Sequence, residues 1–449
     1  MLGYLVSDKA NWKRTAVQAW LMLVLAMSVI SFEVHARDIN WCRVSFGEPL
    51  RIMYGVQGTG GGHLTRARQL VTKLRSKNVQ LRFVFSGRPK DGFDDADHEE
   101  LFGKDAIYLR GVTWVTNGQV AKEQGKELLP GGKVKRFFGL IEADEARVNR
   151  YETVKSAALS LPDLIRDVNA LDLTNFDLVI SDFEPITAWA ARISGVPLYG
   201  IAHQYSFFHD EVPQGIAMRT YVGWGMKAMA PVKKSNAIGL HFDPFKSMVL
   251  PPMVRPNPEG MKKDYTKITV YLPHENQTKV IKMLAQIKGY RFEVYAPEHR
   301  FETLSKDGRT PLDENGNRLE HIHLNFRSDG TYVQNFYTSF ATIVNAGFGA
   351  MSEALKAGIH LMAKPQGGQP EQRANVIALK KLGYGEGLSG LNAKDLAAWL
   401  EAIKGKEAVK ISYPDVGTLL ADWVEAGLPE MTEEYVENIW QDVQVEWVP

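Results

Sequence analysis

The fold is decided by a short stretch near the beginning of the chain: residues 51–63 read RIMYGVQGTGGGH. The apolar run 51–57 predicts a buried strand, and the glycines that follow interrupt it. From His63 to Lys77, apolar residues recur at helical spacing, and residues 79–86 predict a second strand. A strand, a glycine turn, a helix and another strand are typical of the opening of a doubly wound α/β domain.

The same alternation continues in two blocks along the 449-residue chain. In the first block, strands expected at 177–182 and 196–202 flank a helix at 185–194. In the second block, the pattern restarts with a strand at 268–272 and includes a helix at 370–382. Five prolines between residues 244 and 258 separate the blocks and suit an interdomain linker. We therefore expect two doubly wound, Rossmann-like α/β domains that face each other across a cleft.

These signals divide the chain into consecutive parts. The expected parts are an N-terminal extension at 1–49, a first domain at 50–243 with an insertion at 88–170, a proline-rich linker at 244–265, and a second domain with C-terminal helices at 266–449. Within the insertion, a long helix is expected over 135–170.

The N-terminal extension contains an apolar segment, residues 16–32, which follows the basic residues Lys9, Lys13 and Arg14. Three interpretations stay open at this point. The segment is a signal peptide cleaved after Ala36, a short membrane anchor, or the product of a start codon assigned too far upstream.

Composition excludes several classes of protein. Hydrophobic residues make up 45% and charged residues 23%, which is typical of a globular chain and not of a disordered, collagen-like or coiled-coil one. With 53 basic and 52 acidic residues, no overall field attracts nucleic acid, so no nucleic-acid partner is expected. The single cysteine, Cys42, can form neither an internal disulfide nor a zinc–thiolate cluster.

The glycine turn matches no standard nucleotide motif. A dinucleotide fingerprint needs glycine where His63 stands, and a P-loop needs Gly-Lys-Ser/Thr where Gly60, Gly61 and Gly62 stand. Glycines allow a ligand or another backbone to approach closely, although a purely structural turn is an equal alternative. His63 is expected at a helix N-terminus, where the helix dipole favours its neutral, basic form; a packing or capping role stays open.

A second glycine turn lies in the second domain, where residues 345–353 read NAGFGAMSE. The helix that follows offers free amides to a diphosphate, and Glu353, one turn into it, can accept hydrogen bonds from ribose hydroxyls. Residues 366–375 read QGGQPEQRAN and place amides and acceptors at the start of another helix. Such side chains suit sugar hydroxyls, which donate and accept hydrogen bonds.

Together these segments resemble the donor-binding half of GT-B glycosyltransferases, in particular UDP-glycosyltransferases and the N-acetylglucosaminyltransferase that makes lipid II. The family motif His-Cys-Gly-Trp-Asn-Ser-x-x-Glu is matched at Asn345, Gly347, Phe348 and Glu353, and Asp/Glu-Gln-x-x-Asn is matched within residues 371–375. The turn before His63 is similar to the glycine-rich loop of the lipid II enzyme.

Two departures from the family motif affect the diphosphate site. The leading histidine is replaced by Asn345, and the Asn-Ser pair by Gly349-Ala350. The resemblance therefore implies that backbone amides are the main clamp on the diphosphate.

The resemblance also implies roles for individual residues. Glu353 would hold the ribose, Glu371 and Gln372 the donor sugar, and Phe326 would lie near the base. The full set of expected donor-binding residues is Gly58, Gly60, Gly61, Gly62, Phe326, Asn345, Gly347, Phe348, Gly349, Glu353, Gln369, Glu371, Gln372 and Asn375.

Three residues are candidates for catalysis. His63 is the preferred base, and Asp182 and Glu184, at the end of the strand at 177–182, either orient His63 or act as the base. A helix N-cap is the alternative role for these carboxylates.

The expected function is transfer of a sugar from a nucleotide-diphosphate donor, with a UDP-sugar preferred, to an acceptor hydroxyl. We expect inversion, no cofactor and no metal. The acceptor is open, with lipid-linked or glycan acceptors included; a sugar-nucleotide epimerase and a non-catalytic sugar-nucleotide-binding protein are the alternatives.

The expected location follows from donor supply, because nucleotide sugars are made in the cytoplasm. We therefore expect a cytoplasmic body, with association with the inner membrane left open. Residues 226–234 and 133–138 mix basic and large apolar groups, which suits contact with an anionic membrane or a lipid-linked acceptor, or else an ordinary half-buried surface.

Overall fold

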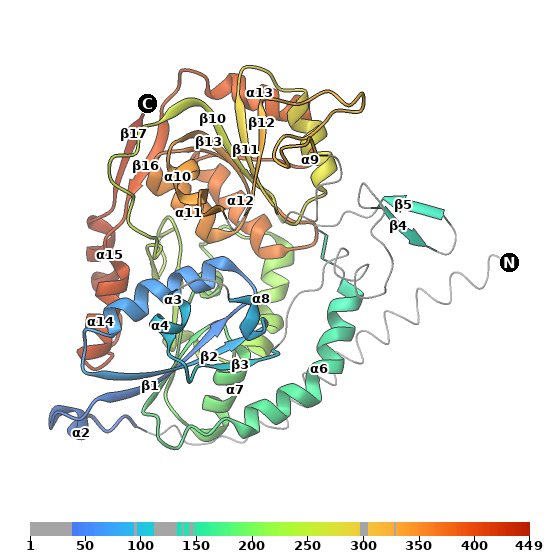
Figure 1. The fold of residues 1–449 in the computed structure, drawn as a ribbon. Coiled ribbons are helices and arrows are strands. Elements are labelled where there is room, and N and C mark those ends of the chain that lie inside the picture. The colour runs from blue at the N-terminus through green and yellow to red at the C-terminus, as the bar shows by residue number, and fades with distance from the viewer. Residues whose placement is uncertain are drawn as a thin grey trace.

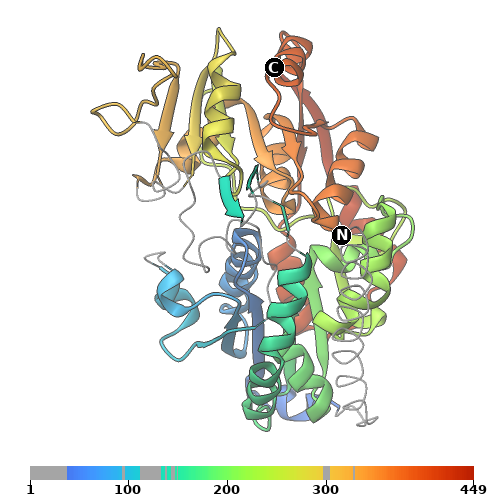
Figure 2. The ribbon, with the colours of Figure 1, turned by 90° about the vertical axis from the view of Figure 1, so that its right-hand side faces the viewer.

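The computed structural model contains two α/β units, each built on a parallel sheet (Figure 1). It describes residues 38–93, 97–111, 133–136, 139–142, 147–148, 150–296, 304–326 and 329–449. Figure 2 shows the second unit, in yellow and orange, above the first, in blue and green.

The first unit is a seven-stranded sheet with the order β3-β2-β1-β6-β7-β8-β9. All its pairings are parallel, and the central strands β1 and β6 are almost fully buried, as expected for a sheet covered on both faces. Its strands are β1 (Leu50–Gln57), β2 (Val79–Ser86), β3 (Ile107–Leu109), β6 (Leu178–Asp182), β7 (Leu198–Ala202), β8 (Ala237–Leu240) and β9 (Val249–Leu250). Its helices are α2 (Trp41–Ser45), α3 (Gly61–Leu74), α4 (His98–Phe102), α6 (Arg150–Ala170), α7 (Pro185–Ser194) and α8 (Ile216–Met229).

The second unit is a six-stranded parallel sheet with the order β12-β11-β10-β13-β14-β15. Its strands are β10 (Asp264–Tyr271), β11 (Arg291–Tyr295), β12 (Ile322–Asn325), β13 (Ser339–Asn345), β14 (His360–Lys364) and β15 (Glu386–Gly387). Its helices are α9 (Gln277–Ala285), α10 (Tyr332–Tyr337), α11 (Phe348–Ala357), α12 (Pro370–Leu382) and α13 (Ala393–Ile403).

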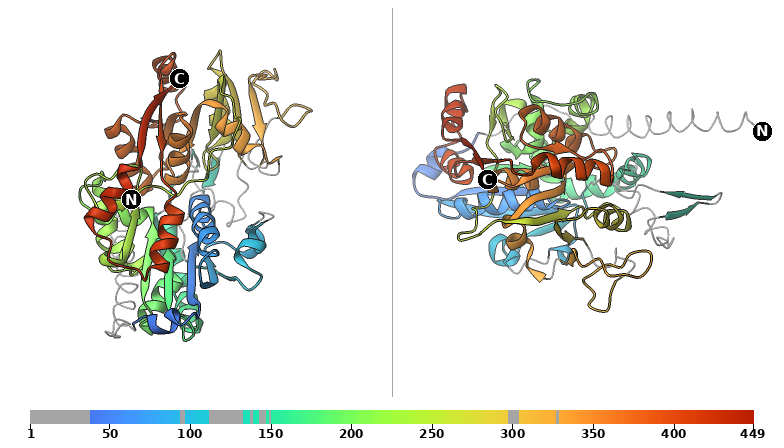
Figure 3. Two further views of the ribbon diagram at one scale, coloured as in Figure 1. Left: turned by 90° about the vertical axis from the view of Figure 1, so that its left-hand side faces the viewer. Right: turned by 90° about the horizontal axis from the view of Figure 1, so that it is seen from above.

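The C-terminal segment returns to the first unit. An antiparallel pair, β16 (Ala408–Ser412) and β17 (Gln444–Val448), packs beside α11, whereas α14 (Val416–Glu425) packs on α3 and α15 (Glu433–Gln441) on β9. The left view of Figure 3 shows these red helices reaching down to the first unit. The chain therefore crosses between the units three times: through the connecting segment, from β16 to α14, and from α15 back to β17.

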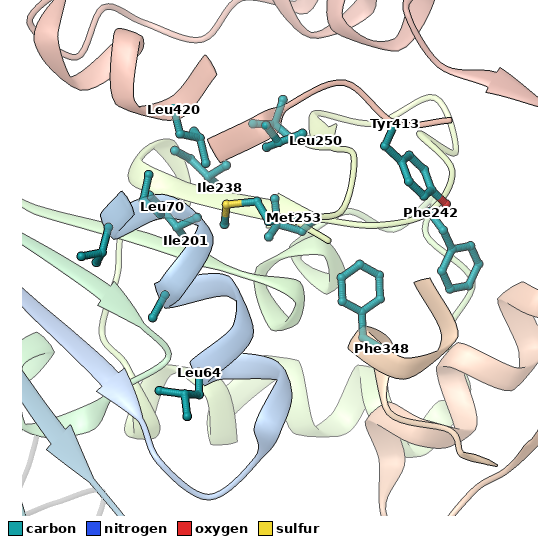
Figure 4. Packing of buried hydrophobic residues seen from close by; sticks show 14 of the residues in the cluster. Leu64, Leu70, Ile201, Ile238, Phe242, Leu250, Met253, Phe348, Tyr413 and Leu420 are labelled. Carbon is teal, nitrogen blue, oxygen red and sulfur yellow. The ribbon is translucent and has the colours of Figure 1, made fainter. Parts of the chain in front are cut away.

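One apolar cluster joins the two units. It contains Leu64 and Leu70 of α3, Phe348 of α11 and Leu420 of α14, together with Met253 of the connecting segment (Figure 4). Because these side chains share one buried core, the units are held against each other by hydrophobic packing.

The observed elements agree with most of those expected. The strand at 79–86 and the helices at 185–194 and 370–382 have the expected bounds. The helix expected over 135–170 is wrong in its first part, because residues 133–136 and 139–142 form the antiparallel strands β4 (Lys133–Arg136) and β5 (Gly139–Glu142). Two short segments separated by two residues favour a hairpin over a helix.

The part of the chain that the structure describes contains no helix long and apolar enough to cross a membrane. The apolar segment 16–32 lies outside the described residues.

Candidate active site between the two domains

A histidine and an aspartate meet at the carboxyl end of the first sheet. His63 is the third residue of α3, which follows β1, and Asp182 is the last residue of the neighbouring strand β6. The distance from His63 Nδ1 to Asp182 Oδ1 is 2.8 Å; Asp182 is completely buried, and the His63 side chain is 13% exposed. His63 Nδ1 also lies 2.8 Å from Arg66 Nη2. Because a carboxylate only accepts, the tautomer with its proton on Nδ1 satisfies the contact with Asp182, and that tautomer leaves a lone pair on Nε2.

Arg66 completes this cluster. Its Nε donates to Asp182 Oδ2 at 3.1 Å and its Nη2 to Asp182 Oδ1 at 2.6 Å. Burial opposes ionisation of Asp182, but the charge of Arg66 and the contact with His63 outweigh it and lower the pKa of the carboxyl group. Sequence reasoning missed Arg66; its position three residues after His63, on the same helix face, was the available signal.

Glu184 has a structural role that differs from the role of Asp182. It is the N-cap of α7, where Oε1 accepts from the Ile186 amide at 2.9 Å and Oε2 from the Thr187 amide at 2.7 Å. Its carboxylate is fully buried, and burial raises its pKa. Of the three catalytic candidates, the structure therefore brings together His63 and Asp182, while Glu184 caps a helix.

Phe183 separates these two carboxylates and has a left-handed backbone, with φ 55°. For a bulky residue this conformation is strained, and such strain concentrates at functional sites. The bend directs Asp182 to the end of the sheet and Glu184 to the start of α7.

The first glycine turn serves two structural purposes. The Gly58 amide donates to the Ser86 carbonyl at 2.7 Å, and a β-carbon on Gly58 would lie only 2.9 Å from that carbonyl oxygen, so this position needs glycine. Gly60 is the N-cap of α3, and Gly61 has open space where a side chain would lie.

The two glycine turns meet across the domain boundary. A β-carbon on Gly349, near the start of α11, would lie 3.4 Å from the Cα of Gly62. The N-termini of α3 and α11 therefore face each other, and both bring positive ends of helix dipoles to one place. A pocket opens here, lined by Gly62, Thr65, Arg66, Pro252, Met253, Val254, Phe348, Gly349, Ser352 and Glu353.

Glu353 forms part of this pocket wall. It is buried, and Oε1 accepts from Arg255 Nε at 3.0 Å. Burial raises the pKa of Glu353, and the opposing charge of Arg255 limits that rise. The carboxylate predicted to hold a ribose is therefore at the pocket, where a residue of the connecting segment holds it.

Two other residues of the second glycine turn have structural roles within the second domain. Gly347 is the N-cap of α11. Asn345 Nδ2 donates to the Lys364 carbonyl at 3.2 Å and to Glu275 Oε1 at 3.3 Å, and that carboxylate also pairs with Lys364 Nζ at 2.7 Å. The side-chain amide of Asn345 therefore points to a buried ion pair inside the second domain.

Phe348 packs across the domain boundary. Its ring stacks on the ring of His203, with centroids 3.9 Å apart and planes 1° from parallel. Phe326 lies apart from the residues that line the pocket, and the Arg309 guanidinium covers its ring at 4.3 Å. The structure therefore brings Phe348 to the pocket, and the expected place of Phe326 near the base stays a prediction.

Two of the residues expected to bind the donor, Glu371 and Asn375, contact the first domain. Glu371 Oε2 accepts from Gln204 Nε2 at 3.1 Å. The Asn375 amide donates to the Ala346 carbonyl at 3.0 Å, and its Oδ1 lies 2.7 Å from His203 Nε2. The contacts with Gln204 and His203 form where the two domains meet, so no local sequence pattern predicts them.

Two neighbouring glutamines fix the local backbone. Gln369 caps α12 by accepting from the Glu371 amide at 2.9 Å, and Gln372 Oε1 accepts from the Gln366 amide at 2.8 Å. Both side chains lie at the N-terminus of α12 and close the loop that precedes it.

Within the described ranges, no three His, Cys, Asp or Glu side chains are grouped so that they could hold a metal ion. In the basic and apolar stretch 226–234, Met226, Ala230 and Val232 are buried in a core cluster. Their apolar surface is therefore not available to a membrane.

Two Rossmann-like units that face each other, with C-terminal helices that return to the first unit, define the GT-B architecture. The model of the family "Glycosyl transferase family 1" matches residues 112–404, and the chain belongs to that family. No curated protein matches the sequence.

The chain is similar to several solved structures. The Arabidopsis thaliana glycosyltransferase UGT89C1, solved with UDP, is 12% identical, with 88% of this chain and 98% of that chain covered and a TM-score of 0.49. MurG of Acinetobacter baumannii is 12% identical (88% and 100% covered, TM-score 0.43), and the Streptomyces nogalater glycosyltransferase SnogD is 14% identical (88% and 100% covered, TM-score 0.44).

Proposed function

We propose that this glycosyltransferase transfers a sugar, with inversion and without a metal, from a nucleotide-diphosphate donor to an acceptor hydroxyl. A UDP-sugar is the preferred donor. The observation that carries the proposal is the 2.8 Å contact between His63 Nδ1 and the buried Asp182 carboxylate. It leaves one imidazole nitrogen basic, at a helix N-terminus one residue from the interdomain pocket.

The reaction is a single displacement. His63 Nε2 takes the proton from the acceptor hydroxyl while the oxygen attacks the anomeric carbon from the side opposite the diphosphate. The bond from that carbon to the phosphate oxygen breaks, and the nucleoside diphosphate leaves. Asp182 stabilises the imidazolium that forms, and the N-terminus of α11 stabilises the negative charge on the leaving group.

The donor would lie along the second domain. Glu353, at the pocket wall, is the proposed partner of the ribose hydroxyls, and it would exchange its contact with Arg255 for them. Glu371 and Gln372, at the start of α12, are the proposed partners of the donor sugar. The acceptor class is a hydroxyl on a lipid-linked molecule or a glycan.

The test is incubation of the protein with a panel of nucleotide sugars, with and without acceptor pools, in the presence of EDTA. The proposal expects acceptor-dependent release of nucleoside diphosphate that EDTA does not abolish, and a product with inverted anomeric configuration by NMR. An isomerised nucleotide sugar formed without acceptor would identify an epimerase instead. Tight binding without turnover would identify a binding protein.

A further inference from the structure

We propose that Arg66 also binds the diphosphate of the donor, reaching across the domain boundary from the acceptor-side domain. The inference rests on the proposed function. It assigns a phosphate-binding side chain to a site where the second domain offers mainly backbone amides.

One edge of the Arg66 guanidinium group is hydrogen-bonded within the protein, and the other edge is free. Nε and Nη2 donate to the two oxygens of Asp182, and Nη2 also lies 2.8 Å from His63 Nδ1, whereas Nη1 makes no hydrogen bond to any residue that the structure describes. The Arg66 side chain is only 5% exposed, and the surface that it keeps lines the interdomain pocket. A buried arginine with an unused edge on a pocket is suited to an anionic ligand.

Gly62 has no side chain, and this leaves space next to the free edge of Arg66. A β-carbon on Gly62 would lie 3.9 Å from Arg66 Nη1 and 4.0 Å from the amide nitrogen of Gly349. The arginine and the start of α11 therefore approach one point from opposite domains. Glycine at position 62 leaves this point open to an oxygen atom that accepts from both.

Charge balance supports this assignment. Two possible competitors for Arg66 are neutralised separately, since Asp182 binds its other edge and Glu353 is paired with Arg255. Side-chain donors are also scarce on the second domain, because residues 349 and 350 are glycine and alanine and the Asn345 amide group donates to Glu275 and the Lys364 carbonyl. Arg66 supplies the missing cation.

Gly62→Ala tests the inference without removing the arginine. Gly62 is helical, its new methyl group would make only ordinary contacts, and alanine favours a helix, so the fold is retained while the point between the domains is filled. The matched control is Gly223→Ala, a helical glycine of α8 that has open space around it. Arg66→Lys is the companion variant.

The measurement is the affinity of each protein for the nucleoside diphosphate that binds the wild type most tightly among UDP, TDP, GDP, ADP and CDP, and for the matching nucleoside, by competition titration. Gly62→Ala and Arg66→Lys should weaken diphosphate binding about 10- to 100-fold, as expected for loss of a charge-assisted hydrogen bond, and change nucleoside binding less than about twofold. Gly223→Ala should match the wild type.

Three results overturn the inference. If the diphosphate binds Gly62→Ala as tightly as the wild type, Arg66 does not reach it; this holds even if Arg66→Lys fails to fold. If nucleoside and diphosphate weaken equally, the residue acts only on the shape of the pocket. If no nucleoside diphosphate binds the wild type, the proposed function fails first and the inference fails with it.

Discussion

His63 and Asp182 lie 119 residues apart in the chain and meet because their strands are neighbours in the sheet. In the proposed mechanism the aspartate selects the tautomer of the histidine, and Arg66 favours the charged form of the aspartate. This division of tasks among three side chains defines what each substitution should do.

Substitution of the histidine should abolish most turnover. His63→Ala should lower kcat by about 10²–10⁴ and leave donor affinity nearly unchanged, because a base acts in the transition state. Transfer kinetics and calorimetric titration of the donor check this. His323→Ala, at an exposed histidine on β12, should behave as wild type.

Substitution of the aspartate should remove the tautomer preference while keeping the shape. Asp182→Asn should lower kcat by at least about 10², since the amide no longer requires a proton on Nδ1. Equal kcat for Asp182→Asn and wild type would show that Asp182 does not orient the histidine.

Substitution of Glu353, the carboxylate in the pocket wall, should weaken binding of the donor. Glu353→Ala should cost about 1.5–3 kcal/mol of binding free energy for the true nucleoside diphosphate, through loss of charge-assisted hydrogen bonds to the ribose. Isothermal titration measures this, with the exposed Glu437→Ala of α15 as control. Unchanged affinity, in a protein of unchanged melting temperature, would remove Glu353 from the site.

At the scale of elements, the sequence predicted the strand–turn–helix units but did not predict the contacts between them. The run 51–63 displays its strand, its glycine turn and the beginning of α3 through local composition alone. The pairing of β1 with β6 depends on which strands become neighbours, a non-local property. The sequence therefore indicated that Asp182 and Glu184 follow a strand, but not that only Asp182 meets His63.

Local resemblance to a motif did not reveal the contacts made by motif residues. Glu371 and Asn375 match the family spacing, yet in this structure they contact Gln204 and His203 of the other domain. Phe348 likewise stacks on His203. Such contacts arise from how two separately folded units approach, and periodicity within one unit carries no information about that.

The residue directly after β8 is a buried histidine, His241, that should make stability depend on pH. His241 Nδ1 accepts from the Phe242 amide at 3.0 Å, and burial, with His203 nearby, holds the pKa of His241 well below 6.5. The unfolded chain takes up a proton below about pH 6.5 and the folded protein does not, so stability falls as pH falls, by about 1.4 kcal/mol per pH unit from this group.

Chemical denaturation of wild type and His241→Phe between pH 7.5 and 5 measures this contribution. The variant should have the flatter profile below pH 6.5, even if its stability at pH 7.5 is lower because the Phe242 amide loses its acceptor. Parallel profiles would contradict a neutral, buried His241.

At the scale of the whole molecule, one apolar cluster unites both sheets and the returning helix α14. Leu420 of α14 is 1% exposed and belongs to that cluster. Leu420→Ala should lower the free energy of unfolding by about 2–4 kcal/mol. Far-UV circular dichroism and tryptophan fluorescence should still report coincident transitions.

The control for this prediction is Leu159→Ala on α6, where the leucine is 68% exposed. It should change stability by no more than about 0.5 kcal/mol. Two separated transitions in Leu420→Ala, one with the wild-type midpoint, would show that the units unfold independently and that the shared core does not couple them.

The central claim is that His63, oriented by Asp182, drives sugar transfer from a nucleotide-diphosphate donor. The most direct measurement is acceptor-dependent release of nucleoside diphosphate by wild type and His63→Ala, each shown to bind the same donor by titration. We expect the wild type to release nucleoside diphosphate, and we expect His63→Ala to release it about 10²–10⁴ times more slowly while retaining its affinity for the donor. Equal release by the two proteins would contradict it.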